Sequence, residues 1–187
     1  MIQRLLGLAL IACFSPVCLA QGEARSAVAS DELIGILAGI VHYTRWPETP
    51  ALLHVCVDTR DELASGAGAR RLADALATLG PAPVSIESRR LETGAASLSD
   101  CQALYVSDLA PAAWQRLLKE LVNRPVLTIG YGEEFCSWGG QFCLERAAPG
   151  TTTDLRIRAN LDAISRSGLR VNPQLLRLTQ RDPKAPR

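Results

Sequence analysis

Cysteine is the residue type that offers this chain the most chemistry, because 6 of its 187 residues are cysteines. Cys13 and Cys18 lie in an apolar N-terminal stretch, and the other four are Cys56, Cys101, Cys136 and Cys143. An even number of thiols in an exported domain is typical of disulfide bonds, whereas thiols in a cytosolic protein more often bind metals or perform redox chemistry. The compartment therefore decides what these cysteines do.

The first twenty residues have the pattern of a signal peptide. Arg4 is basic, residues 5–14 are apolar, and Cys18-Leu19-Ala20 provides a small-x-small cleavage site. Such a segment is too short to span a bilayer, which needs about 20 apolar residues, and no later stretch is long and apolar enough. The alternative is that Cys18 carries a lipid, although the preceding residues, Ser15-Pro16-Val17, fit a lipidation site poorly. We expect cleavage after residue 20, export to a bacterial periplasm, and two disulfides among the four remaining cysteines.

The rest of the chain is expected to form one domain at residues 31–180, between a disordered segment at 21–30 and a frayed tail at 181–187. The whole chain has 20 basic and 19 acidic residues, and removal of Arg4 leaves 19 of each. A chain without net charge has no basic excess to attract nucleic acid or anionic membranes. We therefore expect no nucleic-acid partner.

The other residue types form no recognisable catalytic or metal-binding pattern. Cys136 and Cys143 with two distant histidines, His42 and His54, lack the close, repeated spacing of a zinc site. Each histidine is more simply a packed or surface residue than a general base, and no G-x-S-x-G elbow is present. The GYGEE run at 130–134 resembles a phosphate loop, but it lacks the lysine and carries two acids, so we interpret it as a turn. We expect no enzyme, no metal and no cofactor.

Apolar residues recur at helical spacing in four segments. The expected helices run from an N-cap at Ser30 to a stop at Trp46-Pro47, over 69–79, over 111–122, and over 161–167 between Asn160 and Gly168. Short apolar runs predict strands at 52–57, 84–88, 103–107, 125–129 and 155–159. We also expect Gly139-Gly140 to turn a hairpin between 135–138 and 141–145.

Strands that alternate with helices are typical of parallel βαβ units. The expected fold class is therefore α/β: a single domain with a mixed, mostly parallel sheet flanked by helices. The predicted hairpin forms a C-terminal excursion from that sheet, and two disulfides staple the domain.

Several runs resemble the YfiR family of periplasmic proteins, from about residue 31 to 178. The early part of the resemblance lies in HYTRWP at 42–47 and HVCV at 54–57, and the middle part in DCQALYVS at 100–107 and PVLTI at 125–129. The closing part is NLDA at 160–163, SGLRV at 167–171 and PQLLRL at 173–178. A longer loop around 149–153 departs from the usual family pattern.

The resemblance implies a periplasmic repressor that binds the periplasmic sensor domain of an inner-membrane diguanylate cyclase. Repression lowers cyclic di-GMP and biofilm formation, and an OmpA-like outer-membrane lipoprotein captures the repressor to relieve it. The resemblance also implies a homodimer and disulfides that respond to periplasmic redox state.

The resemblance pairs Cys56 with Cys101 and Cys136 with Cys143, whereas four cysteines on their own allow three connectivities. A loop-entropy model assigns ~4 kcal/mol to the longer loop and ~2.5 kcal/mol to the shorter one. The short bridge is the better redox-sensitive candidate. The alternative is that both bridges merely hold the fold together.

A ligand or partner surface is expected in the C-terminal part of the chain, where Arg166, Arg170 and Arg177 lie with Asn172 among apolar residues. Arginine forks there could hold a carboxylate or phosphate, and the resemblance implies a small-molecule ligand in this region. Trp138, between two cysteines, is a second candidate contact for a partner. The alternatives are a solvated charged face for the arginines and a cover over the disulfide for Trp138.

Two classes of function follow. The first is the non-enzymatic repressor described above. The second is a periplasmic small-molecule-binding module that serves a transporter or a receptor kinase through the crevice at the carboxyl ends of the parallel strands.

Overall fold

A six-stranded sheet forms the centre of the computed structural model, which describes residues 20–79, 83–91, 98–107, 109–146 and 155–179. The strand order is β3-β2-β4-β5-β6-β7. The strands are β2 (Leu53–Asp58), β3 (Val84–Arg89), β4 (Ala103–Val106), β5 (Leu127–Tyr131), β6 (Phe142–Arg146) and β7 (Leu155–Ala159). All neighbouring pairs are parallel except β6 and β7, which are antiparallel. The predicted α/β class with a mixed, mostly parallel sheet is confirmed.

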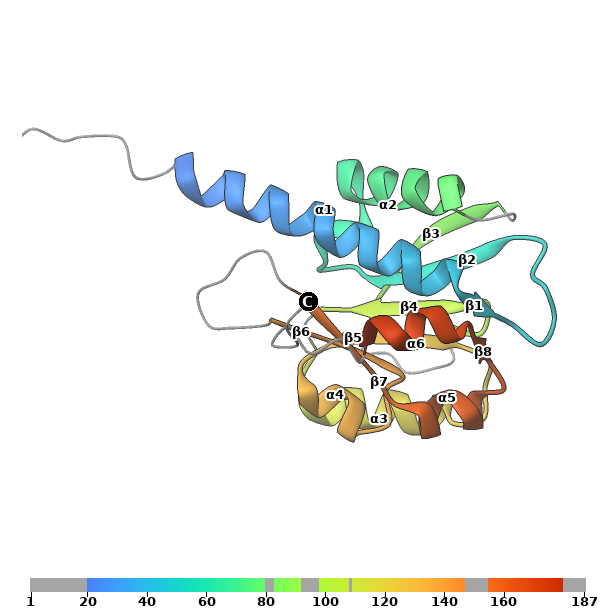
Figure 1. Cartoon of the computed structure of the whole chain (residues 1–187). Coiled ribbons are helices and arrows are strands. Elements are labelled where there is room, and N and C mark those ends of the chain that lie inside the picture. Colours follow the sequence, from blue (N-terminus) through green and yellow to red (C-terminus); the bar gives the residue numbers. More distant parts are fainter. Residues whose placement is uncertain (1–19, 80–82, 92–97, 108, 147–154, 180–187) are drawn as a thin grey trace, which may run out of the picture.

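Helices cover both faces of this sheet (Figure 1). One face carries α1 (Ala20–His42) and α2 (Gly66–Leu79), and the other carries α3 (Pro111–Leu121), α4 (Glu133–Ser137) and α5 (Leu161–Ser167). The last helix, α6 (Pro173–Thr179), contacts the edge strand β7, and a short 3₁₀ helix, η1 (Glu62–Ala64), follows β2. No helix in the described part of the chain is long and apolar enough to cross a membrane.

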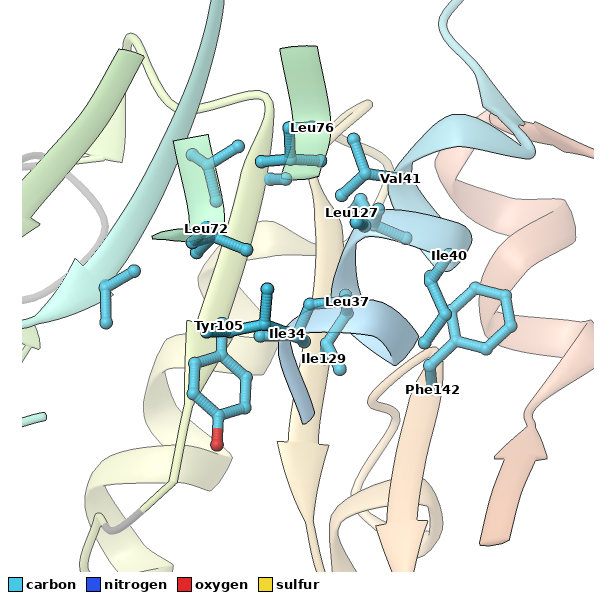
Figure 2. Packing of buried hydrophobic residues seen from close by; sticks show 14 of the residues in the cluster. Ile34, Leu37, Ile40, Val41, Leu72, Leu76, Tyr105, Leu127, Ile129 and Phe142 are labelled. Carbon is cyan, nitrogen blue, oxygen red and sulfur yellow. The ribbon is translucent and has the colours of Figure 1, made fainter. Parts of the chain in front are cut away.

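Strand β4 shows why the sheet needs cover on both sides. All of its residues are buried, and alternate side chains point to opposite faces. Ala103 and Tyr105 join the apolar cluster under α1 and α2, whereas Leu104 and Val106 join the cluster under α3. Figure 2 shows the first of these clusters, with residues of α1 and α2 packed over the central strands.

Most predicted elements are confirmed to within a few residues. The helices expected at 69–79, 111–122 and 161–167 are α2, α3 and α5, and the five predicted strands are β2, β3, β4, β5 and β7. The signals at the ends of α5 act as expected. Asn160 accepts a hydrogen bond from Ala163 N at its start, and Gly168 adopts a left-handed conformation with φ of 75° at its end.

The first helix begins earlier than predicted. We expected an N-cap at Ser30 after a disordered segment, but α1 begins at Ala20 and includes residues 21–30. The reason lies in composition, because this stretch is rich in alanine and contains no proline or glycine after Gly22. The predicted signal peptide, apart from residue 20, and the predicted tail at 181–187 lie outside the described residues.

The predicted hairpin around Gly139-Gly140 is wrong. Residues 133–137 form helix α4 rather than a strand, and β6 pairs in parallel with β5. The GYGEE run is therefore not a turn: residues 130–131 end β5, Gly132 precedes the helix with φ of 87°, and two glutamates occupy its first turn. Acidic side chains at that position complement the helix dipole.

A second, two-stranded sheet joins distant parts of the chain. Strand β1 (Thr44–Arg45) follows α1 and pairs antiparallel with β8 (Arg170–Val171), which follows α5. This small sheet positions several of the predicted site residues.

Candidate functional site

The two disulfides join the cysteines that the resemblance pairs. Cys56 of β2 is bonded to Cys101 just before β4, and Cys136 of α4 is bonded to Cys143 of β6, with Cα atoms 5.8 Å apart in each pair. Cys56, Cys101 and Cys143 are buried, whereas Cys136 is half-buried. The short bridge is therefore the one with a sulfur close to the surface.

Close packing around Phe135 places the short bridge. The Phe135 ring is buried below Gly130 and Gly140, and a Cβ atom on Gly130 would lie 2.8 Å from the ring carbon Cγ. A Cβ atom on Gly140 would overlap the same ring. Because neither glycine has a side chain, the Phe135 ring fits beside them and holds α4 against the sheet. Cys136 is the next residue of this helix.

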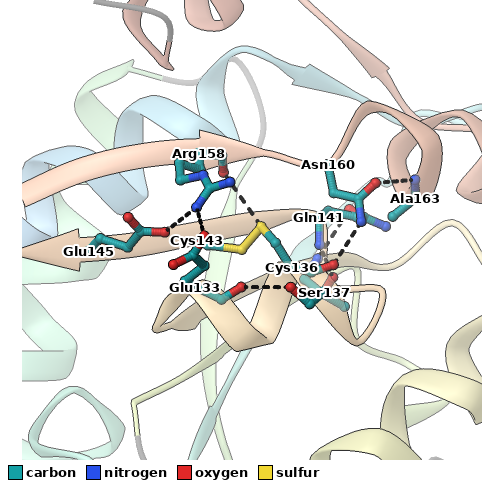
Figure 3. Close-up of a disulfide and its surroundings, with 10 residues drawn as sticks. Glu133, Cys136, Ser137, Gln141, Cys143, Glu145, Arg158, Asn160 and Ala163 are labelled. Atoms are coloured by element: carbon teal, nitrogen blue, oxygen red, sulfur yellow. Dashed lines mark hydrogen bonds and ion pairs between the residues drawn. A yellow bond between two sulfur atoms is a disulfide. The ribbon is translucent and has the colours of Figure 1, made fainter. Parts of the chain in front are cut away.

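A polar network surrounds the bridge on its exposed side (Figure 3). Arg158 Nη1 of β7 donates to Glu133 Oε1 at 2.7 Å and to Glu145 Oε1 at 3.2 Å. The hydrogen bond with Glu133 and the charge of Glu145 raise the pKa of Arg158. Because Arg158 and Glu133 are exposed, each of these ion pairs contributes at most about 1 kcal/mol.

Asn160 connects the bridge region to α5. Its Nδ2 donates to the Cys136 carbonyl oxygen at 2.8 Å, while its Oδ1 accepts from Ala163 N at 3.0 Å. One side chain therefore caps α5 and holds the backbone of α4 (Figure 3).

Trp138 and Arg166, two of the predicted site residues, line one hollow of about 120 Å³ between α3, α5 and the start of β6. Trp138 is half-buried against the cluster that contains both bridges, and Arg166 forms an ion pair with Asp162 one turn earlier. The buried amide of Gln141, which also lines the hollow, is satisfied internally by Thr128 N and by the Val126 carbonyl oxygen. The hollow therefore offers an apolar surface with a basic rim.

Arg170 and Asn172, the next two predicted site residues, lie at the small sheet. Arg170 is exposed and is directly opposite Arg45 in the register of β1 and β8. Asn172 N donates to the Tyr43 carbonyl oxygen at 2.9 Å, and its Oδ1 accepts from Gln174 N at 2.8 Å. Asn172 thus supports the backbone at the end of β8. The side chain of Arg177, the fifth predicted residue, lies outside the described part.

Arg45 is a candidate site residue that the sequence did not single out. Its Nη1 donates to the carbonyl oxygens of His42 at 2.6 Å and Thr44 at 3.0 Å. Like charges directly opposite each other in a sheet destabilise it, and an anion near both guanidinium groups would offset that repulsion. The signal was present, because Arg45 lies in the HYTRWP run, but its pairing with Arg170 depends on the fold.

The two histidines are not brought together. His54 Nδ1 of β2 lies 3.4 Å from Glu87 Oε1 of β3, and His42 is at the end of α1. Within the described residues, no group of three His, Cys, Asp or Glu side chains is arranged to hold a metal ion.

The parallel part of the sheet has the 2-1-3-4-5 type of order found in flavodoxin-like folds, with its switch point between β2 and β4. At the carboxyl ends of these strands, the acidic groups have partners within the protein: Asp58 accepts from Arg60 Nε at 2.8 Å, and Asp61 accepts from Ser107 Oγ. The hollow described above lies instead near the amino ends of β5 and β6.

The sheet order and the two bridges define the class of this protein: a disulfide-crosslinked, doubly wound α/β domain. The chain belongs to the YfiR/HmsC-like family, whose family model matches residues 34–180. The resemblance noted in the sequence is thereby confirmed.

Proposed function

We propose that this protein is a periplasmic repressor of an inner-membrane diguanylate cyclase and that it acts by binding the periplasmic sensor domain of the cyclase. Bound repressor lowers cyclic di-GMP and restrains biofilm formation. The observation that carries this proposal is membership of the YfiR/HmsC-like family across residues 34–180.

The surface proposed to contact the partner is the small sheet with Arg45 and Arg170. Two guanidinium groups on opposed strands favour a carboxylate, which can accept paired hydrogen bonds from an arginine fork. The sensor domain is accordingly expected to present an acidic side chain to this sheet. Asn172 supports the contact by holding β8 against the Tyr43 carbonyl oxygen.

Repression follows from differential binding. A repressor that binds the inactive conformation of the sensor more tightly than the active one shifts the population toward the inactive state. An OmpA-like outer-membrane lipoprotein relieves repression when it captures the repressor, because capture lowers the free concentration. The functional unit proposed here is a homodimer, and the Cys136–Cys143 bridge supplies its redox sensitivity.

The test measures cyclic di-GMP in the native host after deletion of the gene and complementation with variants. We expect deletion to raise cyclic di-GMP and the wild-type gene to restore the low level. Arg170→Glu should fail to restore it, whereas Arg70→Glu, an equal charge change at an exposed position of α2, should restore it.

Two outcomes would count against parts of this proposal. An unchanged cyclic di-GMP level on deletion would refute the repressor function itself. Full complementation by Arg170→Glu, with the protein present at wild-type abundance, would refute the small sheet as the partner surface. Coexpression pull-down of the sensor domain with the same variants checks direct binding.

A further inference from the structure

The hollow of about 120 Å³ that Trp138 and Arg166 line has charges of one sign at its rim. We call it the α3–α5 hollow. It lies on the face of the sheet that carries α3, α4 and α5 (Figure 1), and it shares no lining residue with the proposed partner surface. Lys119 and Arg166 are exposed lining residues, and no acidic side chain of the described chain lines the hollow. Such a lining favours an anionic group over a cationic one.

Both cations are available to a ligand. Arg166 pairs with Asp162 on the same helix, but both side chains are exposed, and an exposed ion pair of this kind is weak in water. Lys119 makes no ion pair with any described residue. A ligand carboxylate can therefore compete with Asp162 for Arg166 and pair with Lys119 at the same time.

Asn123 adds an uncharged donor to the rim. Among the described residues, it is the one other than glycine that has a positive φ, of 63°. Asparagine adopts this left-handed conformation more readily than most residues. The turn places the exposed Asn123 in the lining of the hollow directly after α3, with Arg124 N donating to the Leu121 carbonyl oxygen at 3.0 Å. The amide group of Asn123 can donate to an anion without adding charge.

The apolar wall limits the size of the ligand. An apolar protein cavity of about 150 Å³ is large enough for benzene, so a hollow of about 120 Å³ suits a group the size of an isobutyl chain better than an aromatic ring. Burial of such a group against apolar side chains is favourable. The apolar lining residues are Leu118, Leu121, Val122, Val126, Trp138 and Ala163.

We propose that the α3–α5 hollow binds a small aliphatic monocarboxylate with a branched alkyl end. The alkyl group lies against the apolar wall, and the carboxylate contacts Lys119, Asn123 and Arg166 at the rim. An α-amino acid with the same alkyl chain fits less well, because no acidic side chain of the described lining can pair with its ammonium group. The proposal does not depend on the repressor function.

The experiment titrates the purified, nitrogen-labelled protein with 4-methylpentanoate and follows the indole N–H signal of Trp138 and the side-chain amide signal of Asn123 by heteronuclear NMR. Trp138→Phe and Asn123→Gly identify these two signals. We expect saturable shifts with a Kd of about 1 mM, which is within the efficiency that ligands of this size reach. The neutral 4-methylpentanamide and the zwitterion L-leucine should each bind about fivefold more weakly, the upper range for one exposed ion pair.

Matched variants locate the site. Lys119→Gln should weaken 4-methylpentanoate about fivefold, whereas Arg116→Gln, an equal charge change at an exposed position of the same helix outside the lining, should not. Asn123→Gly keeps a residue that adopts positive φ and removes only the amide side chain, so it should weaken binding about two- to tenfold. Signal dispersion in the same spectra checks that each variant is folded.

Three results would overturn the proposal. The first is the absence of saturable shifts at Trp138 and Asn123 with 4-methylpentanoate. The second is binding of 4-methylpentanamide or L-leucine as tight as that of 4-methylpentanoate, which would refute recognition of an anion. The third is an equal loss of affinity in Arg116→Gln and Lys119→Gln, which would indicate a general charge effect instead of a site.

Discussion

Removal of the short disulfide is expected to destabilise the protein by about 2.5 kcal/mol. Cys136 and Cys143 are 7 residues apart, and the loop-entropy relation assigns about 2.5 kcal/mol to a loop of that length. Cys56 and Cys101 are 45 residues apart, which corresponds to about 4 kcal/mol. The difference of about 1.5 kcal/mol between the bridges follows from loop length alone.

The assay is urea unfolding followed by far-UV circular dichroism on Cys136→Ala/Cys143→Ala and on Cys56→Ala/Cys101→Ala. For a domain of this size, each kcal/mol lost from the free energy of unfolding lowers Tm by about 2–4 °C. In thermal unfolding, the short-bridge variant should therefore melt roughly 5–10 °C below wild type. Both variants should show a larger slope of unfolding free energy against urea, because a chain without the crosslink exposes more surface when it unfolds.

Packing must be separated from crosslinking, because Cys143 is fully buried and alanine is smaller than cysteine. Reduced proteins provide the control. Reduced wild type and a reduced double alanine variant both lack all crosslinks and differ only in two sulfur atoms, so the difference in their stabilities measures the packing cost. If the short-bridge variant loses as much stability as the long-bridge variant after this correction, the loop-length reasoning is refuted.

Three further predictions concern other parts of the fold. Limited dithiothreitol should reduce the Cys136–Cys143 bridge before the other one, because Cys136 is the half-buried cysteine; alkylation with mass spectrometry checks the order, and simultaneous reduction would contradict it. Gly140→Ala should destabilise the protein by about 1–3 kcal/mol through overlap with a buried ring. Its control, Gly35→Ala in α1, has open space and should stabilise by about 0.5–1 kcal/mol, with both measured by urea unfolding. Burial alone would raise the pKa of Asp58, but hydrogen bonds from Arg60 and Leu91 outweigh burial and lower it. The stability that ionised Asp58 contributes is fully present above its unfolded pKa of about 3.9 and is lost as pH falls through its lower folded pKa. The difference in the free energy of unfolding between wild type and Asp58→Asn should therefore shrink below about pH 4.

The layered sheet could be predicted from the sequence because its signals are local. Buried strands are short apolar runs, and α5 has a capping asparagine at one end and a glycine at the other. Each of these features depends on residues within one or two turns of the chain. The same is true of the apolar stripe of α1, where Leu33 and Leu37 are buried as expected.

Helix α4 could not be predicted in this way. A helix of 5 residues is too short to show a helical period, and Gly139-Gly140 is also a common hairpin signal. The deciding factor is the contact of Gly130 and Gly140 with the Phe135 ring, which exists only after β5 and β6 pair. A packing constraint between neighbouring strands thus overrode the turn signal.

The small sheet shows the same limit at longer range. Strands β1 and β8 have 2 residues each, too few for an alternating pattern, and they come from opposite ends of the domain. Arg170 was recognisable as a candidate by type and position, but its opposition to Arg45 depends on the register between the two strands.

The short bridge and the proposed partner surface are linked through one side chain. Asn160 donates to the Cys136 carbonyl oxygen and caps α5, and α5 leads through Gly168 to β8 with Arg170. Loss of the bridge removes the covalent tie at Cys136, the residue whose carbonyl oxygen Asn160 holds, and leaves the Phe135 packing in place. A shift of Cys136 would therefore reach α5 through the Asn160 cap. The Cys56–Cys101 bridge joins β2 to a residue just before β4 and packs in the same buried cluster as Cys143. The redox sensitivity proposed for the short bridge would therefore reach the proposed partner surface through Asn160 and α5.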